Sequence, residues 1–143
     1  MQLSLECRLD ASPELVFDTM TMPATIVRWW GPRGFTMPEV SVDLRVGGRY
    51  RFTMQPPEGA PFHISGEYVE IAPPVRLAYT FSYEEPTPDD RETAVAIDLD
   101  AAAGGTELRL RQAGFATAER LELHRGGWTG SFEKLGELLA DYG

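Results

Sequence analysis

The chain has 143 residues, with 22 acidic against 13 basic side chains and a formal net charge of -9. This acidic balance repels phosphate backbones and anionic lipid, so it argues against a nucleic-acid partner. One cysteine and two histidines exclude an internal disulfide and a typical zinc cluster. We therefore expect no cofactor, no metal and a reducing, cytoplasmic location.

The length fits a single domain over residues 1–143 that buries a core of its own. The first ten residues have neither a basic start nor a long apolar run. No stretch of about eighteen apolar residues occurs anywhere in the sequence. We expect neither an export signal nor a membrane span.

The first predicted element is a half-buried strand over residues 2–9. Leu3, Leu5, Cys7 and Leu9 alternate with polar side chains and so share one face. Because Cys7 lies on that apolar face without a neighbouring cation, we interpret it as a small buried hydrophobe and not as a reactive thiol.

Two short helices are predicted next. Ser12, Pro13 and Glu14 are a typical helix start, with a capping serine, a proline at the first position and an acid in the first turn. A second helix begins near Pro23 and ends at Gly31-Pro32. Its last residues are two adjacent tryptophans.

Adjacent residues of a helix point about 100° apart. We therefore expect only one of Trp29 and Trp30 to face the core, with the other at a rim. The sequence does not decide which of the two it is, nor whether they only pack or also form the wall or entrance of a cavity.

From residue 38 the apolar period changes to two, which predicts strands. The predicted strands are 38–44 and 50–54, joined by a tight turn at Gly47-Gly48, then 62–71, 77–83, 95–99 and 107–111, the last two joined at Gly104-Gly105. Strand 77–83 carries an aromatic face. Strand 62–71 has apolar residues on both faces, so its inward face stays open.

Residues 84–92 contain two prolines and five acids and predict a solvated loop, to which we assign no function. Residues 117–142 have apolar side chains every three or four positions and predict a helix of about seven turns, long enough to lie across the whole sheet. Within it, Gly126-Gly127 predicts a close approach of a neighbouring segment or a small bend.

Four motifs together resemble one known superfamily: Trp29-Trp30-Gly31-Pro32, the run 45–50, the run 66–77 and Gly127-Trp128. They resemble the START-like, helix-grip (SRPBCC) superfamily, in the branch named for the activator of the heat-shock chaperone ATPase. The resemblance runs from about Asp10 to Leu139. It implies an α+β fold in which a seven-stranded curved antiparallel sheet wraps around a long C-terminal helix.

The resemblance also implies an apolar cavity between sheet and helix, and the physics agrees, because one helix cannot fill a strongly curved sheet. Core packing is the alternative role for each large aromatic residue of the concave face. The predicted ligand-binding wall consists of Trp30, Tyr50, Phe52, Tyr68, Tyr79, Phe81, Trp128 and Phe132.

Three functions stay open. The first is binding of a small hydrophobic or aromatic ligand in the cavity. The second is a cyclase-like reaction there, in which Tyr68 and Tyr79 orient a ligand carbonyl. The third is a chaperone-ATPase-activator-like interaction module. The resemblance also allows a homodimer.

No catalytic constellation is recognisable, and we predict no catalytic residue. A set of Ser65, His63 and Glu67 could be drawn on one strand face, but the strained nucleophile turn of a hydrolase is missing. The residues able to act as acid or base are His63, His124, Glu67, Glu70 and Asp98.

Overall fold

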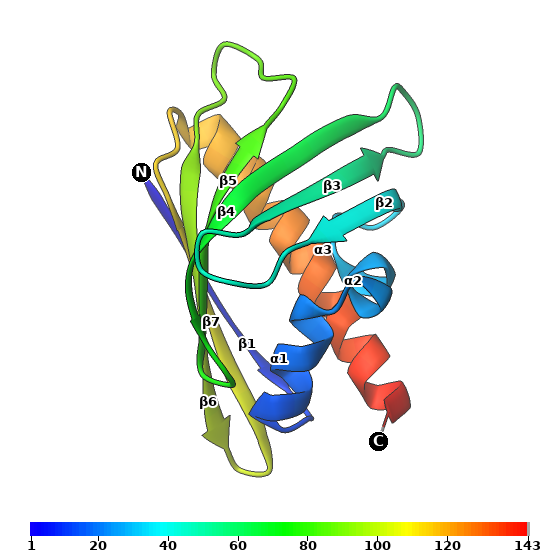
Figure 1. Ribbon diagram of the computed structural model, residues 1–143, viewed down its shortest axis with the longest axis vertical. Helices are drawn as coiled ribbons and strands as arrows, with labels where there is room; N and C mark the ends of the chain where they lie inside the picture. Colours follow the sequence, from blue (N-terminus) through cyan, green and yellow to red (C-terminus); the bar gives the residue numbers. More distant parts are fainter. Residues whose placement is uncertain (143) are drawn as a thin grey trace.

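The computed structural model describes residues 1–142, so Gly143, the last residue of the predicted domain, lies outside them. The described residues form seven strands and three helices in the predicted order (Figure 1). These are β1 (Gln2–Leu9), α1 (Pro13–Thr21), α2 (Pro23–Trp29), β2 (Thr36–Val42), β3 (Arg49–Gln55), β4 (Phe62–Ala72), β5 (Arg76–Tyr83), β6 (Thr93–Ala102), β7 (Gly105–Ala113) and α3 (Ala118–Tyr142).

The strands form one antiparallel sheet in the order β1-β7-β6-β5-β4-β3-β2. Figure 1 shows α3 crossing the concave face of this sheet, with α1 and α2 beside the C-terminal half of α3. The predicted helix-grip architecture is confirmed. None of the helices within residues 1–142 combines the length and the apolar character that a membrane crossing requires.

The start of α1 follows the prediction, since the Ser12 hydroxyl accepts a hydrogen bond from the Leu15 amide at 3.2 Å. The expectation for the tryptophans was wrong, because both are buried: Trp29 is 1% exposed and Trp30 is 8% exposed. The helix ends at Trp29, and Trp30 has an extended backbone with ψ 144°. The angle between neighbouring helical residues therefore does not apply to this pair.

The connection between β2 and β3 is longer than the predicted two-glycine turn. The strand ends at Val42 and not at residue 44, and residues 43–48 form a loop in which Gly47 has a φ of +83°. Backbone hydrogen bonds of 2.9 Å join Gly47 and Gly48 to Tyr68 of β4. The loop is thus fixed both by the neighbouring strand and by its own turn, in which the Gly48 amide donates to the Arg45 carbonyl at 2.8 Å.

The open question about strand 62–71 is answered by a β-bulge. Ile64, Gly66 and Tyr68 face the core, but the register of β4 against β5 shifts between Tyr68 and Glu70. After the shift Ile71 is half-buried against the core, while Val69 is exposed. One inserted residue therefore moves the inward face from even to odd positions.

The last hairpin turns one residue earlier than predicted. Ala102 pairs with Gly105, so the turn consists of Ala103 and Gly104, whose φ angles are +43° and +82°. Positive φ at both central residues matches the right-handed twist of the flanking strands. Gly105 itself belongs to β7.

A buried row of hydrogen-bonded side chains joins α3 to β7 and β6, the second and third strands of the sheet. The Trp128 indole donates to Gln112 Oε1 at 2.8 Å, and Gln112 Nε2 donates to Thr93 Oγ1 at 2.8 Å. All three side chains are buried, and they come from α3, β7 and β6. Each polar atom in this row of three side chains has a hydrogen-bond partner, so burying the row carries little free-energy penalty. The row also fixes the rotation of α3 about its axis.

Replacing Trp128 with alanine should lower the free energy of unfolding by about 3–5 kcal/mol, because it empties a core site and leaves Gln112 without its donor. Tyr142→Ala, at an exposed position of the same helix, is the control and should change little. Urea unfolding of both variants checks this. Equal stability of Trp128→Ala and the wild type would contradict the packing of α3.

Replacing Gly66 and Gly126 with alanine should change the stability of the protein in opposite directions. A Cβ at Gly66 would overlap the Thr80 carbonyl oxygen and the Tyr50 ring, so Gly66→Ala should destabilise the fold by about 3 kcal/mol. Gly126 lies in the interior of α3 with open space around it, so Gly126→Ala should stabilise by about 1 kcal/mol. Thermal unfolding measures both, and a shift of the same sign for the two would refute the assignment.

Candidate functional site

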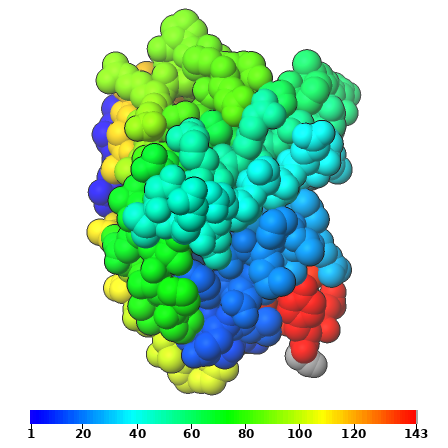
Figure 2. Space-filling model, in the orientation of Figure 1, coloured from blue at the N-terminus to red at the C-terminus, as the bar shows by residue number. Residues whose placement is uncertain are grey.

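A cavity of about 360 Å³ lies between the first half of α3 and the concave face of the sheet. Its apolar lining comes mainly from Trp30, Phe35, Met54, Phe62, Phe81 and Trp128. Two connections line its ends, residues 30–35 between α2 and β2 and residues 84–92 between β5 and β6. In Figures 1 and 2 the second connection forms the end of the molecule opposite the C-terminus of α3.

Aromatic rings in mutual contact form the inner wall of the cavity. The Trp30 ring meets the Trp128 ring edge-to-face at 5.8 Å and lies stacked over Phe81 at 6.3 Å. Trp30 reaches this position because α2 ends before it and Gly31, with a φ of +92°, turns the chain away. The three rings come from the segment after α2, from β5 and from α3, and their mutual packing fixes the shape of the wall.

Small residues of α3 leave the space that the cavity occupies. Gly127 and Ser131 line the cavity one turn apart, with Trp128 between them. Pro32 lies across this stretch, and a Cβ added at Gly127 would stand 3.5 Å from Pro32 Cγ. A neighbouring segment therefore lies against Gly127, at a distance that an alanine would also allow, whereas a Cβ at Gly126 would have no neighbour within 4 Å.

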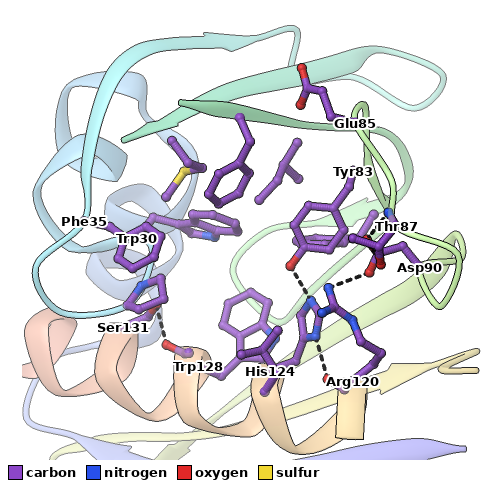
Figure 3. Close-up of a pocket in the computed structure, with 18 residues that line it drawn as sticks. Trp30, Phe35, Tyr83, Glu85, Thr87, Asp90, Arg120, His124, Trp128 and Ser131 are labelled. Carbon is purple, nitrogen blue, oxygen red and sulfur yellow. Dashed lines mark hydrogen bonds and ion pairs between the residues drawn. The ribbon is translucent and has the colours of Figure 1, made fainter. Parts of the chain in front are cut away.

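A hydrogen-bonded row of polar side chains closes the other end of the cavity (Figure 3). The Tyr83 hydroxyl is 2.8 Å from His124 Nε2, and His124 Nδ1 is 2.9 Å from the Arg120 carbonyl oxygen. A carbonyl oxygen only accepts, so Nδ1 carries the proton of the neutral imidazole. Nε2 therefore accepts the hydrogen bond, and Tyr83 donates it.

An ion pair continues this row into the loop 84–92. Arg120 Nη2 lies 2.5 Å from Asp90 Oδ1, and the Asp90 side chain is only 7% exposed. Asp90 Oδ2 in turn accepts from the Thr87 amide at 2.8 Å and from the Thr87 hydroxyl at 3.0 Å. The loop was expected to be solvated and was assigned no function, but three of its residues, Glu85, Thr87 and Asp90, line the cavity.

Burial keeps the Tyr83–His124 pair uncharged. It raises the pKa of Tyr83 to about 12. It lowers the pKa of His124 below the ordinary value of 6.5, and the nearby positive charge of Arg120 acts in the same direction. The Arg120 guanidinium also lies 5.8 Å from the centre of the Tyr83 ring.

The predicted wall residues divide into three groups. Trp30, Phe81 and Trp128 line the cavity. Phe132 lies on the far side of Trp128 and borders a separate groove between β1 and α3. The remaining four, Tyr50, Phe52, Tyr68 and Tyr79, pack against one another in the core, beside a void of only about 20 Å³.

Of the candidate acid and base residues, His124 lines the cavity, whereas His63, Glu67, Glu70 and Asp98 do not. His63 bonds to Glu85 at 2.7 Å and not to Ser65 or Glu67, so the drawn hydrolase set does not assemble. His63, Glu84 and Glu85 come within metal-binding reach of one another, but Glu84 already pairs with Arg51 at 2.9 Å.

Two further acids and the cysteine also lie away from the cavity. Glu70 and Asp98 both pair with Arg76, at 2.8 and 2.7 Å. Cys7 is half-buried, and burial raises its pKa to about 11, as expected of an unreactive thiol.

Several cavity residues were not among the predicted wall. Tyr83 ends the aromatic face of β5, and His124 precedes Trp128 by one helical turn, so the apolar periods already pointed to both. The sequence did not decide whether Phe62 faces the core, because the inward face of its strand was undecided. Asp90 and Arg120 carried no such signal, since their contact joins a loop to a helix thirty residues away.

Comparison with known proteins agrees with this architecture. The sheet curved around one long helix defines the helix-grip class. Residues 10–140 match the family described as "Activator of Hsp90 ATPase homolog 1-like protein". The chain belongs to this family, and the resemblance seen in the sequence is confirmed. No curated protein matches the chain.

Solved structures of similar fold come from several bacteria. A protein of Chromobacterium violaceum is 28% identical with a TM-score of 0.89 over 96% of both chains. The AHSA1 protein of Silicibacter pomeroyi is 28% identical with a TM-score of 0.85 over 100% of both. CalU16 of Micromonospora echinospora is 28% identical with a TM-score of 0.72, covering 96% of this chain and 75% of its own.

The lowered pKa of His124 predicts a pH dependence of stability. The unfolded chain takes up a proton near pH 6.5 while the folded protein does not, so the contribution of His124 is complete above that pH and is lost as pH falls through the lower folded pKa. Urea unfolding from about pH 8 to pH 5 should show the wild type losing stability relative to His124→Gln. Parallel curves for the two proteins would contradict the buried neutral imidazole.

Proposed function

We propose that this protein binds a small, mainly apolar molecule in the cavity between α3 and the sheet. The observation that carries the proposal is the combination of an aromatic wall at Trp30, Phe81 and Trp128 with a hydrogen-bonded polar end at Tyr83 and His124. Pockets for small molecules commonly combine a mostly apolar lining with a few placed polar groups, and 360 Å³ falls within their usual range of about 300–1,000 Å³.

The expected affinity follows from the apolar area that a ligand would bury. Removing about 250 Å² of apolar ligand surface from water contributes about 6 kcal/mol before the cost of association is counted. This corresponds to a dissociation constant of about 40 μM as the best value for an unsubstituted hydrocarbon of that size. Calorimetry measures this range directly.

A reaction of cyclase type in the same cavity is the second candidate. The observation that favours it is the neutral His124 imidazole, whose Nε2 acceptor faces the Tyr83 hydroxyl at the cavity edge. Such a pair is suited to moving a proton to or from a bound carbonyl compound. A chaperone-activating role stays a prediction of the family resemblance.

The binding proposal is tested by filling the cavity. Ser131→Leu adds a side chain to the cavity wall, and it loses only a hydroxyl bonded to the Gly127 carbonyl of the same helix. Thr129→Leu is the matched control, since its hydroxyl bonds to the Arg125 carbonyl and its side chain is exposed outside the cavity. Calorimetric titration with naphthalene and with decanol should show saturable binding to wild type and control, at least tenfold weaker in Ser131→Leu.

Absence of saturable naphthalene binding to the wild type would refute the proposal. So would equal affinity of the wild type and Ser131→Leu, provided that the variant melts cooperatively. Native mass spectrometry of the freshly purified protein adds an independent measurement, because a co-purified molecule of constant mass identifies a resident ligand.

A further inference from the structure

Two hydrogen-bonding groups at the polar end of the cavity have no partner among the described residues: the lone pairs of the Tyr83 hydroxyl oxygen, which accept, and the buried Nε–H of Arg120, which donates. His124 uses both ring nitrogens, one toward Tyr83 and the other toward the Arg120 carbonyl. Tyr83 uses its proton toward His124, so the lone pairs of its oxygen are free at the cavity edge (Figure 3). A ligand group that donates a hydrogen bond can therefore be received at Tyr83 Oη without breaking the row.

The charges at this end do not favour an anion. Arg120 is the one cationic side chain among the described residues that line the cavity, and Asp90 already neutralises it at 2.5 Å. Glu85 adds a further negative charge to the lining and is held by His63. A carboxylate entering here would lose its hydration shell without gaining an unpaired cation.

We infer that the cavity selects an uncharged aromatic molecule that carries a hydroxyl group, with the hydroxyl donating to Tyr83 Oη and the ring lying against Trp30, Phe81 and Trp128. The inference rests on the proposed binding function and names the ligand class for it. The aromatic part follows from the wall, whose ring faces and edges offer stacked and edge-to-face contacts to a flat ring. The uncharged hydroxyl follows from the free acceptor and the neutralised cation.

Three probes of one shape separate the contributions: naphthalene, naphthol and naphthoate, titrated calorimetrically near neutral pH. Naphthol should bind about tenfold more tightly than naphthalene, the equivalent of one hydrogen bond. Naphthoate should bind at least tenfold more weakly than naphthol, because it is an anion. Equal affinities for naphthol and naphthalene, or tighter binding of naphthoate, would overturn the inference.

Two variants assign these preferences to residues. Tyr83→Phe should abolish the preference for naphthol over naphthalene while naphthalene still binds, which also shows that the variant is folded. Tyr79→Phe removes a buried hydroxyl from the same face of β5, outside the cavity, and should leave the preference intact. A preference that survives in Tyr83→Phe would contradict the role of Tyr83 Oη.

Asp90→Asn tests the charge argument by a gain of binding. The asparagine keeps an oxygen for Thr87 but leaves the Arg120 charge unneutralised, so the affinity for naphthoate should rise about tenfold while that for naphthol changes less than twofold. Unchanged naphthoate binding would overturn the charge argument. If naphthalene itself fails to bind the wild type, the proposed function is refuted; if it binds without any preference among the probes, only the present inference is.

Discussion

The hydrogen bond from the Trp128 indole to Gln112 is the contact on which the arrangement of the site depends. It is buried, it joins the long helix to β7, the second strand of the sheet, and Gln112 donates a further hydrogen bond to Thr93 of the adjacent strand β6. A buried amide of this kind is costly unless all its partners are in place, so one rotation of α3 is strongly preferred. That rotation directs His124, Gly127 and Ser131 to the cavity.

The concave face is filled at one end and hollow at the other, and the distribution of side-chain size explains the difference. Along the C-terminal half of α3, Leu135, Leu138 and Leu139 are buried, and α1 and α2 complete the packing. Toward the N-terminal half the helix presents Gly127 and Ser131, and no further helix covers the strands in the described part of the chain. Two connecting segments, residues 30–35 and 84–92, border this space instead and leave a cavity.

Most elements could be predicted from the sequence because apolar period and turn chemistry are local properties. The alternation of residues 77–83 and the start of α1 at Ser12 are examples. The sequence left the structure open, or the prediction was wrong, where tertiary contacts override the local pattern. The bulge after Tyr68 reverses the inward face of β4, and Trp30 leaves its helix through a backbone change that no periodicity records.

The candidate site was predictable only in part, for the same reason. Large aromatic residues mark the concave face, but alternation does not say which of them meet and which leave a gap; Tyr50 and Tyr79 pack together, while Phe81 borders the cavity. The ion pair between Asp90 and Arg120 lies entirely outside such patterns, since it joins an acidic loop to a helix. Because this ion pair lies beside the cavity, the loop forms part of the cavity lining, although its composition alone predicts only a solvated segment.

The three tryptophans provide the most direct measurement of whether the cavity takes up a ligand. Trp30 and Trp128 line it, whereas Trp29 packs against Phe132 and donates to the Thr19 carbonyl at 3.0 Å, away from the cavity. In a proton–nitrogen correlation spectrum titrated with naphthalene, the indole signals of Trp30 and Trp128 should move and saturate while that of Trp29 stays in place. Three stationary signals, or a Trp29 signal that moves as far as the other two, would contradict a ligand site in this cavity.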